Sequence, residues 1–242
     1  DISLPQDSRV SVVVSPENLG VPGGRHLGLL RCSAPIVGFL DDDAVVRSAA
    51  SARILDEFAL IPELGAVSLR LVDELGLSMR RHVPRPRGTS PERSGDVALF
   101  LGGASALRVE AYEQVGGYFT DLFYGHEEVE LCWRLVDAGW RIRYLADVTV
   151  FHPRTEIGRH TSGWRLTGRN RVLVARRTLP APVAAVHVLA WFVLGAVRAP
   201  DRETRRSYIT GWWSGWDRPV ERRPISWRGV WRLTRLGRPP VI

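Results

Sequence analysis

Three consecutive aspartates, Asp41, Asp42 and Asp43, end an apolar run at residues 35–40. A short apolar run of this kind is typical of a buried strand, and open α/β sheets bind ligands beyond the carboxyl ends of their strands. Carboxylates gathered there suit a hard divalent cation, which takes oxygen ligands and shares them with phosphates. A solvated acidic turn that caps the next helix would look the same, because Asp is a good N-cap. The three residues alone leave both interpretations open.

A second acidic pair, Glu127 and Glu128, begins a predicted helix that Gly139 ends. A hydroxyl nucleophile needs a general base near neutral pH, and a carboxylate can fill that role. Acids in the first turn of a helix also complement its dipole without any catalysis. Glu130 and Arg134, four residues apart, could be no more than a surface ion pair.

The segment from Asn18 to Arg25 is rich in turn residues and is predicted as a loop before a helix at residues 25–31. Backbone amides at Gly23 and Gly24 could receive a diphosphate at the start of that helix. The guanidinium of Arg25 could add positive charge to the same place.

Short apolar runs alternate with helical patterns along residues 1–152, which predicts an α/β fold with a mixed, largely parallel sheet. The predicted strands are 10–14, 35–40, 65–72, 142–145 and 148–151, with a further apolar run at 99–107 that Gly102 and Gly103 interrupt. The predicted helices are 25–31, 44–60, 109–115 and 127–138, and residues 83–96 are predicted as a surface loop. The glycine pair could let the backbone approach a substrate, or could be only a bulge.

Charge divides the chain into two parts. Residues 1–152 hold 15 Arg against 21 acids, whereas residues 153–242 hold 18 Arg against 5 acids. We therefore expect a domain over 1–155 and a helical Arg/Trp-rich extension over 156–242. A basic tail suits an anionic lipid surface or another polyanion. We expect no nucleic-acid partner, because no recognised binding module is present.

The extension contains an apolar run at residues 181–197 that is at the lower limit for spanning a bilayer, which takes about 20 residues. Trp191 and the flanking Arg residues fit a helix lying in the membrane interface, and so do the later Trp residues, because Trp prefers the headgroup region. The same helices could instead pack on the domain. Cys32 and Cys132 offer neither a zinc motif nor a disulfide framework, and the amino terminus lacks signal-peptide features, so a cytoplasmic location is expected.

The order of the motifs along the chain resembles the inverting glycosyltransferases of family 2, which have the GT-A fold, and the tail is similar to actinobacterial members. The resemblance covers nearly the whole chain. It is carried by Asn18–Arg25, Phe39–Asp43, Gly102–Ser105, Val115–Tyr118, Phe123–Leu135, Gly139–Trp140, Val150–His152, Gly168–Arg171 and Leu236–Pro240.

The resemblance implies a nucleotide-diphospho-sugar donor, Mg or Mn as the cofactor, and a single displacement at the anomeric carbon. It assigns metal ligation to Asp43, with Asp41 and His152 as further ligands, although His152 could be only a hydrogen-bonded histidine at a strand end. The base is Glu128, or Glu127 next to it, in place of the usual Glu-Asp pair. The donor region includes Asn18, Gly20, Gly24, Arg25, Asp41 and Asp42, and the acceptor region includes Gly102, Gly103 and Glu130.

We expect transfer of a sugar to a hydroxyl of a cell-envelope glycan or a lipid-linked acceptor, at the inner face of the plasma membrane. Family members begin with a further strand and helix, about 50 residues, that hold part of the nucleotide. A shortened chain, a wrong gene start or a natural remnant would each explain why this sequence begins later. Two alternatives remain: an inactive remnant that binds a membrane or a glycan, and a nucleotidyltransferase, which also uses aspartates and Mg.

Overall fold

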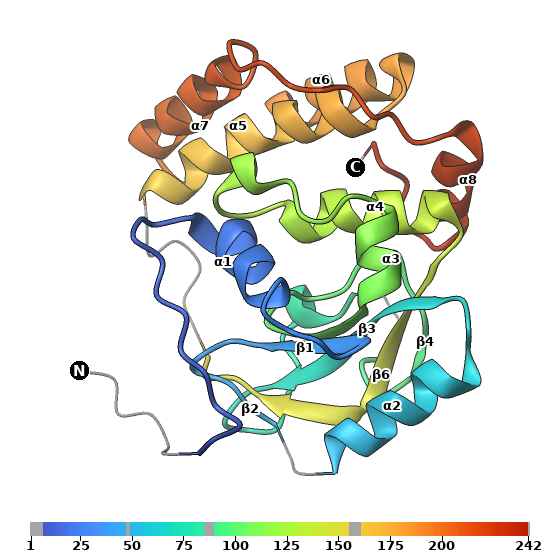
Figure 1. The fold of residues 1–242 in the computed structure, drawn as a ribbon. Helices are drawn as coiled ribbons and strands as arrows, with labels where there is room; N and C mark the ends of the chain where they lie inside the picture. The colour runs from blue at the N-terminus through green and yellow to red at the C-terminus, as the bar shows by residue number, and fades with distance from the viewer. Residues whose placement is uncertain (1–6, 47–48, 85–89, 155–160, 242) are drawn as a thin grey trace.

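The computed structural model describes residues 7–46, 49–84, 90–154 and 161–241. At its centre, strands in the order β1-β5-β3-β6-β2 form a sheet, with β4 paired to β6, and helices lie on both sides of it (Figure 1). The strands are β1 Ile36–Leu40, β2 Val45–Val46, β3 Leu64–Val72, β4 Gly95–Asp96, β5 Ala104–Arg108 and β6 Arg141–Phe151.

The sheet is mixed, as predicted, but the expected dominance of parallel pairing is wrong. Among the described residues only β3 and β6 pair in parallel, and β1–β5, β3–β5, β2–β6 and β4–β6 are antiparallel. Parallel neighbours need a long crossover, usually a helix. No α-helix separates β3 from β5 in the described part of the chain, so β5 returns antiparallel to β3.

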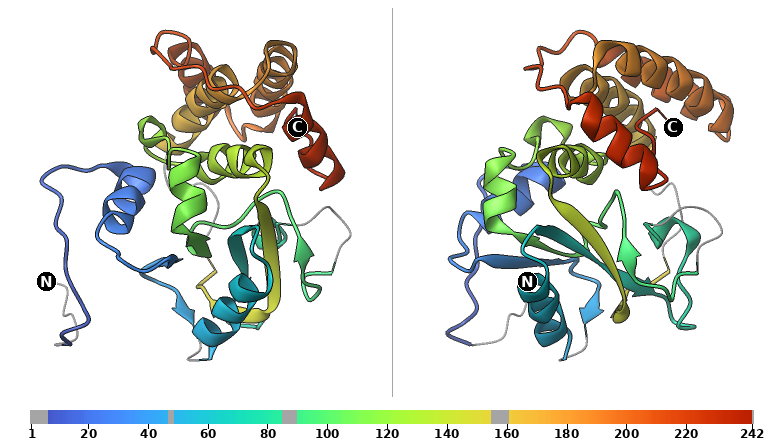
Figure 2. Two further views of the ribbon diagram at one scale, coloured as in Figure 1. Left: turned by 45° about the vertical axis from the view of Figure 1, so that its right-hand side comes forward. Right: turned by 90° about the vertical axis from the view of Figure 1, so that its right-hand side faces the viewer.

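Helices cover the two faces of the sheet unequally (Figure 2). α2 (Ala50–Leu60) covers one face, where its Phe58 packs in a buried cluster with Val67 and Leu145. The other face carries α1 (Gly20–Leu29), α3 (Val109–Gln114) and α4 (Glu127–Ala138), together with the 3-10 turn η2 (Thr120–Leu122). A second 3-10 turn, η1, spans Arg80–His82.

The strand pattern explains why both faces are buried. Ala66 and Val67 are neighbours in β3, yet Ala66 belongs to the cluster under α4 and Val67 to the cluster under α2. Alternate residues of a strand point to opposite faces, so an apolar run is needed where both faces are covered. Prediction of a buried strand at 65–72 and of a helix at 127–138 is confirmed by β3 and α4.

Three predicted elements differ from the structure. Residues 10–14 are exposed and form no strand, because no neighbouring strand pairs with them. α1 begins at Gly20, inside the predicted loop, where Pro22 is tolerated in the first turn because its missing N–H would lack a helical partner. α2 begins at Ala50, later than predicted, since Val45–Val46 pair with β6 instead.

The two short strands predicted at 142–145 and 148–151 form one strand, β6. Its register against β3 shifts between Leu69 and Arg70, which accommodates the residues between the two apolar runs. The strand therefore runs without interruption to Phe151. His152 follows it and lies at the edge of the sheet beside β2.

The C-terminal part is helical, as predicted, and consists of α5 Thr161–Thr178, α6 Ala181–Arg198, α7 Arg202–Ser214 and α8 Trp227–Arg235. α5 and α7 cross closely: a Cβ at Gly168 would lie 2.3 Å from the Tyr208 carbonyl oxygen, and one at Gly211 would lie 1.9 Å from that of Arg165. Glycine is needed at both positions because any side chain would force the helices apart. The predicted boundary at 153–162 lies largely outside the described residues.

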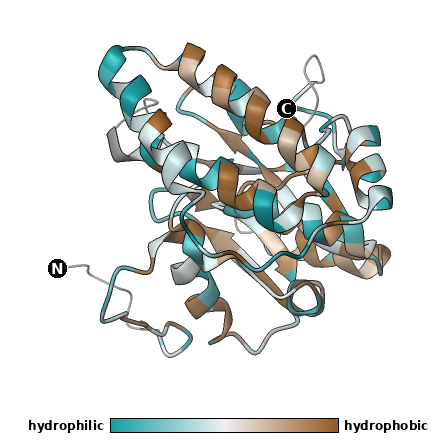
Figure 3. Ribbon diagram, turned by 90° about the horizontal axis from the view of Figure 1, so that it is seen from above, coloured by the Kyte–Doolittle hydropathy of each residue, from teal (hydrophilic) through white to brown (hydrophobic). Residues whose placement is uncertain are grey.

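α6 is the one helix, in the described part of the chain, whose length and composition would let it cross a membrane. One of its faces packs on the body, where His187 shares a 2.7 Å hydrogen bond with the Pro240 carbonyl oxygen. The opposite face is exposed and carries Val186, Leu189, Val193 and Val197. Figure 3, which views the molecule from above relative to Figure 1, shows apolar and polar segments next to one another along the C-terminal helices.

Candidate active site

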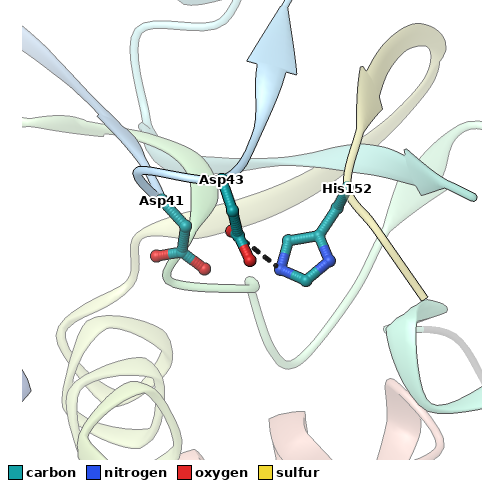
Figure 4. A group of neighbouring side chains, drawn as sticks. All are labelled: Asp41, Asp43 and His152. Carbon is teal, nitrogen blue, oxygen red and sulfur yellow. Dashed lines mark ion pairs between the residues drawn. The ribbon is translucent and has the colours of Figure 1, made fainter. Parts of the chain in front are cut away.

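The aspartate triplet forms the turn between β1 and β2, and His152 directly follows β6. The pairing of Val45 with Phe151 brings the two segments together at one edge of the sheet. Asp43 Oδ1 lies 3.3 Å from His152 Nε2, and one ligand atom from each of Asp41, Asp43 and His152 lies within 4.8 Å of the others (Figure 4). The three residues predicted as metal ligands, Asp41, Asp43 and His152, form this cation cluster, and Asp42 lies outside it.

The donor set of the cation cluster fits a divalent cation. His152 Nδ1 lies 2.8 Å from the Pro153 carbonyl oxygen, so this nitrogen is the donor and Nε2 is the ring nitrogen that faces Asp43. A hydrogen bond of this kind fixes the tautomer of metal-binding histidines. Two carboxylates and one imidazole nitrogen gathered in this way are ligands that a divalent cation can take.

A second histidine, His82, lies beside the cation cluster and was not found by sequence reasoning. Its ring centroid is 5.9 Å from that of His152. Burial, together with the charges of Arg81 and His152, lowers the pKa of His82 to about 4. Arg81 Nε donates to His82 Nε2 at 3.1 Å. His82 is therefore neutral near pH 7 and packs against the ring of His152, the candidate ligand. The sequence did not indicate this contact, because it forms only when η1 folds against the end of β6.

Arg25 connects the cation cluster to the acidic start of α4. Its guanidinium lies 2.8 Å from Glu128 Oε1, 3.4 Å from Asp41 Oδ1 and 3.5 Å from Glu127 Oε1. Burial opposes the charge of Arg25, but the negative charges of Glu128 and Glu127 outweigh it, so the pKa of Arg25 lies above its ordinary value. The predicted donor-region arginine thus stands between two groups of carboxylates and is cationic at any working pH.

Gly102 and Gly103 let the backbone pass directly behind these side chains. A Cβ at Gly103 would lie 1.8 Å from Asp41 Oδ2, and one at Gly102 would lie 2.0 Å from an Arg25 nitrogen. The Gly103 carbonyl oxygen also accepts the Asp41 amide at 3.1 Å. The glycine pair is therefore part of the site, because larger residues would displace Asp41 and Arg25.

Glu127 and Glu128 begin α4 after His126, whose backbone is left-handed. The Glu127 side chain is buried, and its Oε2 has no hydrogen-bond partner. Burial, followed by the charge of Glu128, raises the pKa of Glu127 well above the ordinary value. The Glu128 side chain is 21% exposed. The two neighbours therefore differ: Glu127 favours its protonated form, and Glu128 faces the open side of the site.

The loop that presents this pair is held by α5. Asn170 is buried, and its Nδ2 donates to the carbonyl oxygens of Leu122, Tyr124 and Gly125 at 2.8–3.0 Å. The motif Gly168–Arg171 marked this region in the sequence, but nothing in the motif indicated that its Asn holds a loop far away in the chain. Asn170 is a residue of the site that sequence reasoning missed.

Two parts of the sequence prediction need correction. Glu130 is neither at an acceptor site nor in a surface ion pair: it is fully buried, and its carboxylate accepts from Arg134, Arg177 and Thr178. Its charge is satisfied within the protein, so none of its oxygens is left for a substrate. The carboxylate fixes α4 to α5 instead.

The predicted diphosphate cradle in the segment Asn18–Arg25 is not formed. Asn18 Oδ1 accepts the Gly20 amide at 3.0 Å, and the Phe123 carbonyl oxygen accepts the Val21 amide at 2.7 Å. Gly23 and Gly24 lie within α1, so their amides do not face an open loop. The helix begins earlier than expected, and of this segment only Arg25 reaches the acidic side chains.

Comparisons with known proteins show which sequences and folds the chain resembles. The family model "Glycosyl transferase family 2" matches residues 2–116, which include Arg25 and the aspartate triplet and end before Glu127. Over this segment, just under half of the chain, the sequence is similar to glycosyltransferase family 2. A pre-mycofactocin glycosyltransferase of Mycobacterium tuberculosis is 27% identical over 206 residues, which cover 76% of this chain and 42% of the relative. The chain thus spans less than half the length of the curated relatives it matches.

Solved structures show that the chain has the GT-A fold. GalNAc-T7 with UDP, GalNAc and Mn²⁺ superposes with a TM-score of 0.57 and 15% identity over 81% of this chain and 42% of that chain. The mannosyltransferase PcManGT from Pyrobaculum calidifontis, in complex with GDP-Man and Mn²⁺, gives a TM-score of 0.51 and 17% identity over 87% and 58%. Identities this low establish the fold alone.

Proposed function

We propose that this chain transfers a sugar from a nucleotide-diphospho-sugar donor to an acceptor hydroxyl by metal-assisted, inverting single displacement. The supporting observation is that Arg25 joins Asp41 of the cation cluster to Glu128 at the start of α4. The Arg25 guanidinium therefore lies between a group of side chains that could bind a cation and the carboxylates at the start of α4. The two ends match the two demands of the reaction, a departing diphosphate and an incoming hydroxyl.

Asp41, Asp43 and His152 would hold the cation, with Asp42 exposed beside them for the nucleotide. When bound, Mg or Mn offsets the negative charge that develops on the leaving diphosphate. An imidazole in the set favours Mn, since Mg takes oxygen ligands. The structures of GalNAc-T7 and PcManGT were determined with Mn²⁺. Arg25 adds a fixed positive charge next to the same phosphates.

Glu128 accepts the proton of the acceptor hydroxyl. It is the more exposed member of the pair, whereas burial keeps Glu127 in its protonated form. The donor phosphates would draw Arg25 away from Glu128, and the Glu128 carboxylate would then be free to accept the proton of the hydroxyl. The carboxylate would therefore become available only after the donor has bound. This order prevents deprotonation of an acceptor before a donor is in place.

Loss of the base tests the proposal most simply. With UDP- and GDP-sugars at high concentration, Mn²⁺ and an acceptor panel, Glu128→Gln should lower product formation by about 10²–10⁴-fold. The control Glu113→Gln, at an exposed position of α3, should leave product formation unchanged. Metal-dependent product from Glu128→Gln at the wild-type rate would contradict the assignment. No glycoside product at all would favour the non-catalytic alternative, and a nucleotidyl product would favour nucleotidyl transfer.

We also propose that the acceptor is a cell-envelope glycan or a lipid-linked sugar, reached from the cytoplasmic face of the membrane. The support is the exposed apolar stripe of α6, formed by Val186, Leu189, Val193 and Val197 on a part of the chain rich in Arg. Such a face suits a helix lying at an anionic surface. The chain should sediment with anionic vesicles and be released by salt, and Leu189→Asp should weaken binding. Equal binding to neutral vesicles would contradict the electrostatic contribution.

A further inference from the structure

A cavity of about 520 Å³ opens between α1, the loop after η2 and α5. Its apolar wall is formed by Val21, Phe123, Tyr124 and Leu166. No charged residue lines this cavity within the described part of the chain. Its volume lies in the range of small-molecule sites, about 300–1,000 Å³. The cation cluster, Glu127 and Glu128 do not line it, so the cavity is distinct from the groups assigned above.

The aromatic wall is held rigidly. Phe123 has φ 62° and ψ −48°, a backbone conformation that costs energy in a residue other than glycine. Its carbonyl oxygen accepts the Val21 amide, and a Cβ at Gly20 would lie 2.2 Å from that oxygen. Asn170 holds the Tyr124 carbonyl oxygen from the other side. These hydrogen bonds therefore fix the backbone of two neighbouring aromatic residues whose side chains are partly exposed, 39% for Phe123 and 55% for Tyr124.

The cavity adjoins the proposed base. Val21 and Arg25 are four residues apart in α1, which puts them on the same face with Cβ atoms about 6 Å apart. Arg25 in turn lies 2.8 Å from Glu128 Oε1. A molecule whose hydroxyl reached Glu128 could therefore extend along α1 and place its remainder against Val21.

We infer that this cavity binds an apolar group of the acceptor, an aryl or short alkyl aglycone attached to the sugar or alcohol that receives the new linkage. The inference rests on the proposed function for the role of the ligand as an acceptor. The wall disfavours a phosphate or a free carboxylate, because no described cationic side chain lines the cavity to offset the charge of such a group. Aromatic walls favour flat or chain-like apolar groups of about the size that the cavity admits.

Three glucosides that differ only in the aglycone test the inference by titration calorimetry, without donor or metal. Phenyl and hexyl β-D-glucopyranoside should bind the chain about tenfold or more tightly than methyl β-D-glucopyranoside. Tyr124→Ala, at an exposed position, and Leu166→Asp should both reduce that preference to the level of the methyl compound. The control Leu60→Asp, at an exposed position at the end of α2 on the other face of the sheet, should keep it. The comparison of phenyl with hexyl distinguishes an aryl from an alkyl group.

Equal affinity for all three glucosides, or a preference that survives both cavity variants, would overturn the inference. That result is separable from failure of the proposed function, because binding is measured without transfer. A chain that transfers sugar but shows no aglycone preference would retain the proposed function and lose the inference. A chain that shows the preference but forms no glycoside would contradict the acceptor role and the proposed function together.

Discussion

Two acidic groups of this protein, the cation cluster and the Glu130 network, have similar charges and opposite surroundings. The side chains of Asp41 and Asp43 are 43% and 47% exposed, and each has one charged or ring nitrogen near it, from Arg25 and His152 respectively. Glu130 is fully buried and accepts from Arg134, Arg177 and Thr178. In the first group negative charge is left without a full set of partners, and in the second the partners are complete.

The comparison distinguishes a site, whose carboxylates can bind a ligand, from a support, whose carboxylate only stabilises the fold. A buried carboxylate is kept only when it is paired and hydrogen-bonded, so the Glu130 network has no remaining capacity for a ligand. The carboxylates of the cation cluster remain hydrated and close together, which is the condition that a divalent cation relieves. Acidic residues near a candidate site can therefore be divided into two classes. The protein's own donors fully pair the carboxylates of one class and leave those of the other class partly unpaired.

The largest expected effect on stability comes from breaking the Glu130 network. Glu130→Gln would leave Arg134 and Arg177 without their shared carboxylate, at a cost of about 3–5 kcal/mol in the free energy of unfolding. Urea unfolding followed by circular dichroism measures this cost. The control Glu110→Gln, on the exposed side of α3, should change the free energy by less than about 0.5 kcal/mol. Equal stability of the two variants would remove the distinction between site and support.

A smaller effect is expected at Asn170, which connects the support to the site. Asn170→Ala should cost about 1–3 kcal/mol, because the loop carbonyl oxygens lose their donor. Asn170→Asp should cost more, since a carboxylate would face the same carbonyl oxygens of Leu122, Tyr124 and Gly125. If both variants unfold at the wild-type urea midpoint, the loop is held by something other than these hydrogen bonds.

The smallest effect is a difference in pH dependence at Glu127. Its pKa is raised above 4.5 by burial and by the charge of Glu128, so the folded chain binds this proton more tightly than the unfolded chain. Stability from this group is therefore present below the unfolded pKa and is lost as pH rises through the folded pKa. Between about pH 5 and about pH 8, the free energy of unfolding of Glu127→Gln should therefore fall less than that of the wild type. Parallel stability–pH curves would show that Glu127 is not perturbed.

Sequence reasoning located the residues of the site better than it described their surroundings. The aspartate triplet, Arg25 and the Glu127–Glu128 pair are local patterns, and the structure brings Arg25 to both acidic groups. Exposure could not be predicted from spacing. Glu130 and Arg134 have the same i, i+4 spacing whether they lie on a surface or, as here, beneath α5.

The misjudged elements depended on contacts distant in the sequence. The run at 10–14 has a strand composition but no partner strand, and α1 begins at Gly20 because the Phe123 carbonyl oxygen and Asn18 hold its first amides. The direction of β5 depends on the connection before it rather than on its own residues. Asn170 and His82 belong to the site only through the folding of α5 and η1 onto it.

The central claim, that Asp41, Asp43 and His152 form a cation site, is tested most directly by Mn²⁺ titration monitored by water proton relaxation. Asp42→Asn is the matched control, because Asp42 is adjacent in sequence, has the same charge and lies outside the cluster. The account predicts that Asp42→Asn binds Mn²⁺ as the wild type does and that Asp43→Asn binds it about tenfold or more weakly. Equal Mn²⁺ affinity of the two variants would contradict it.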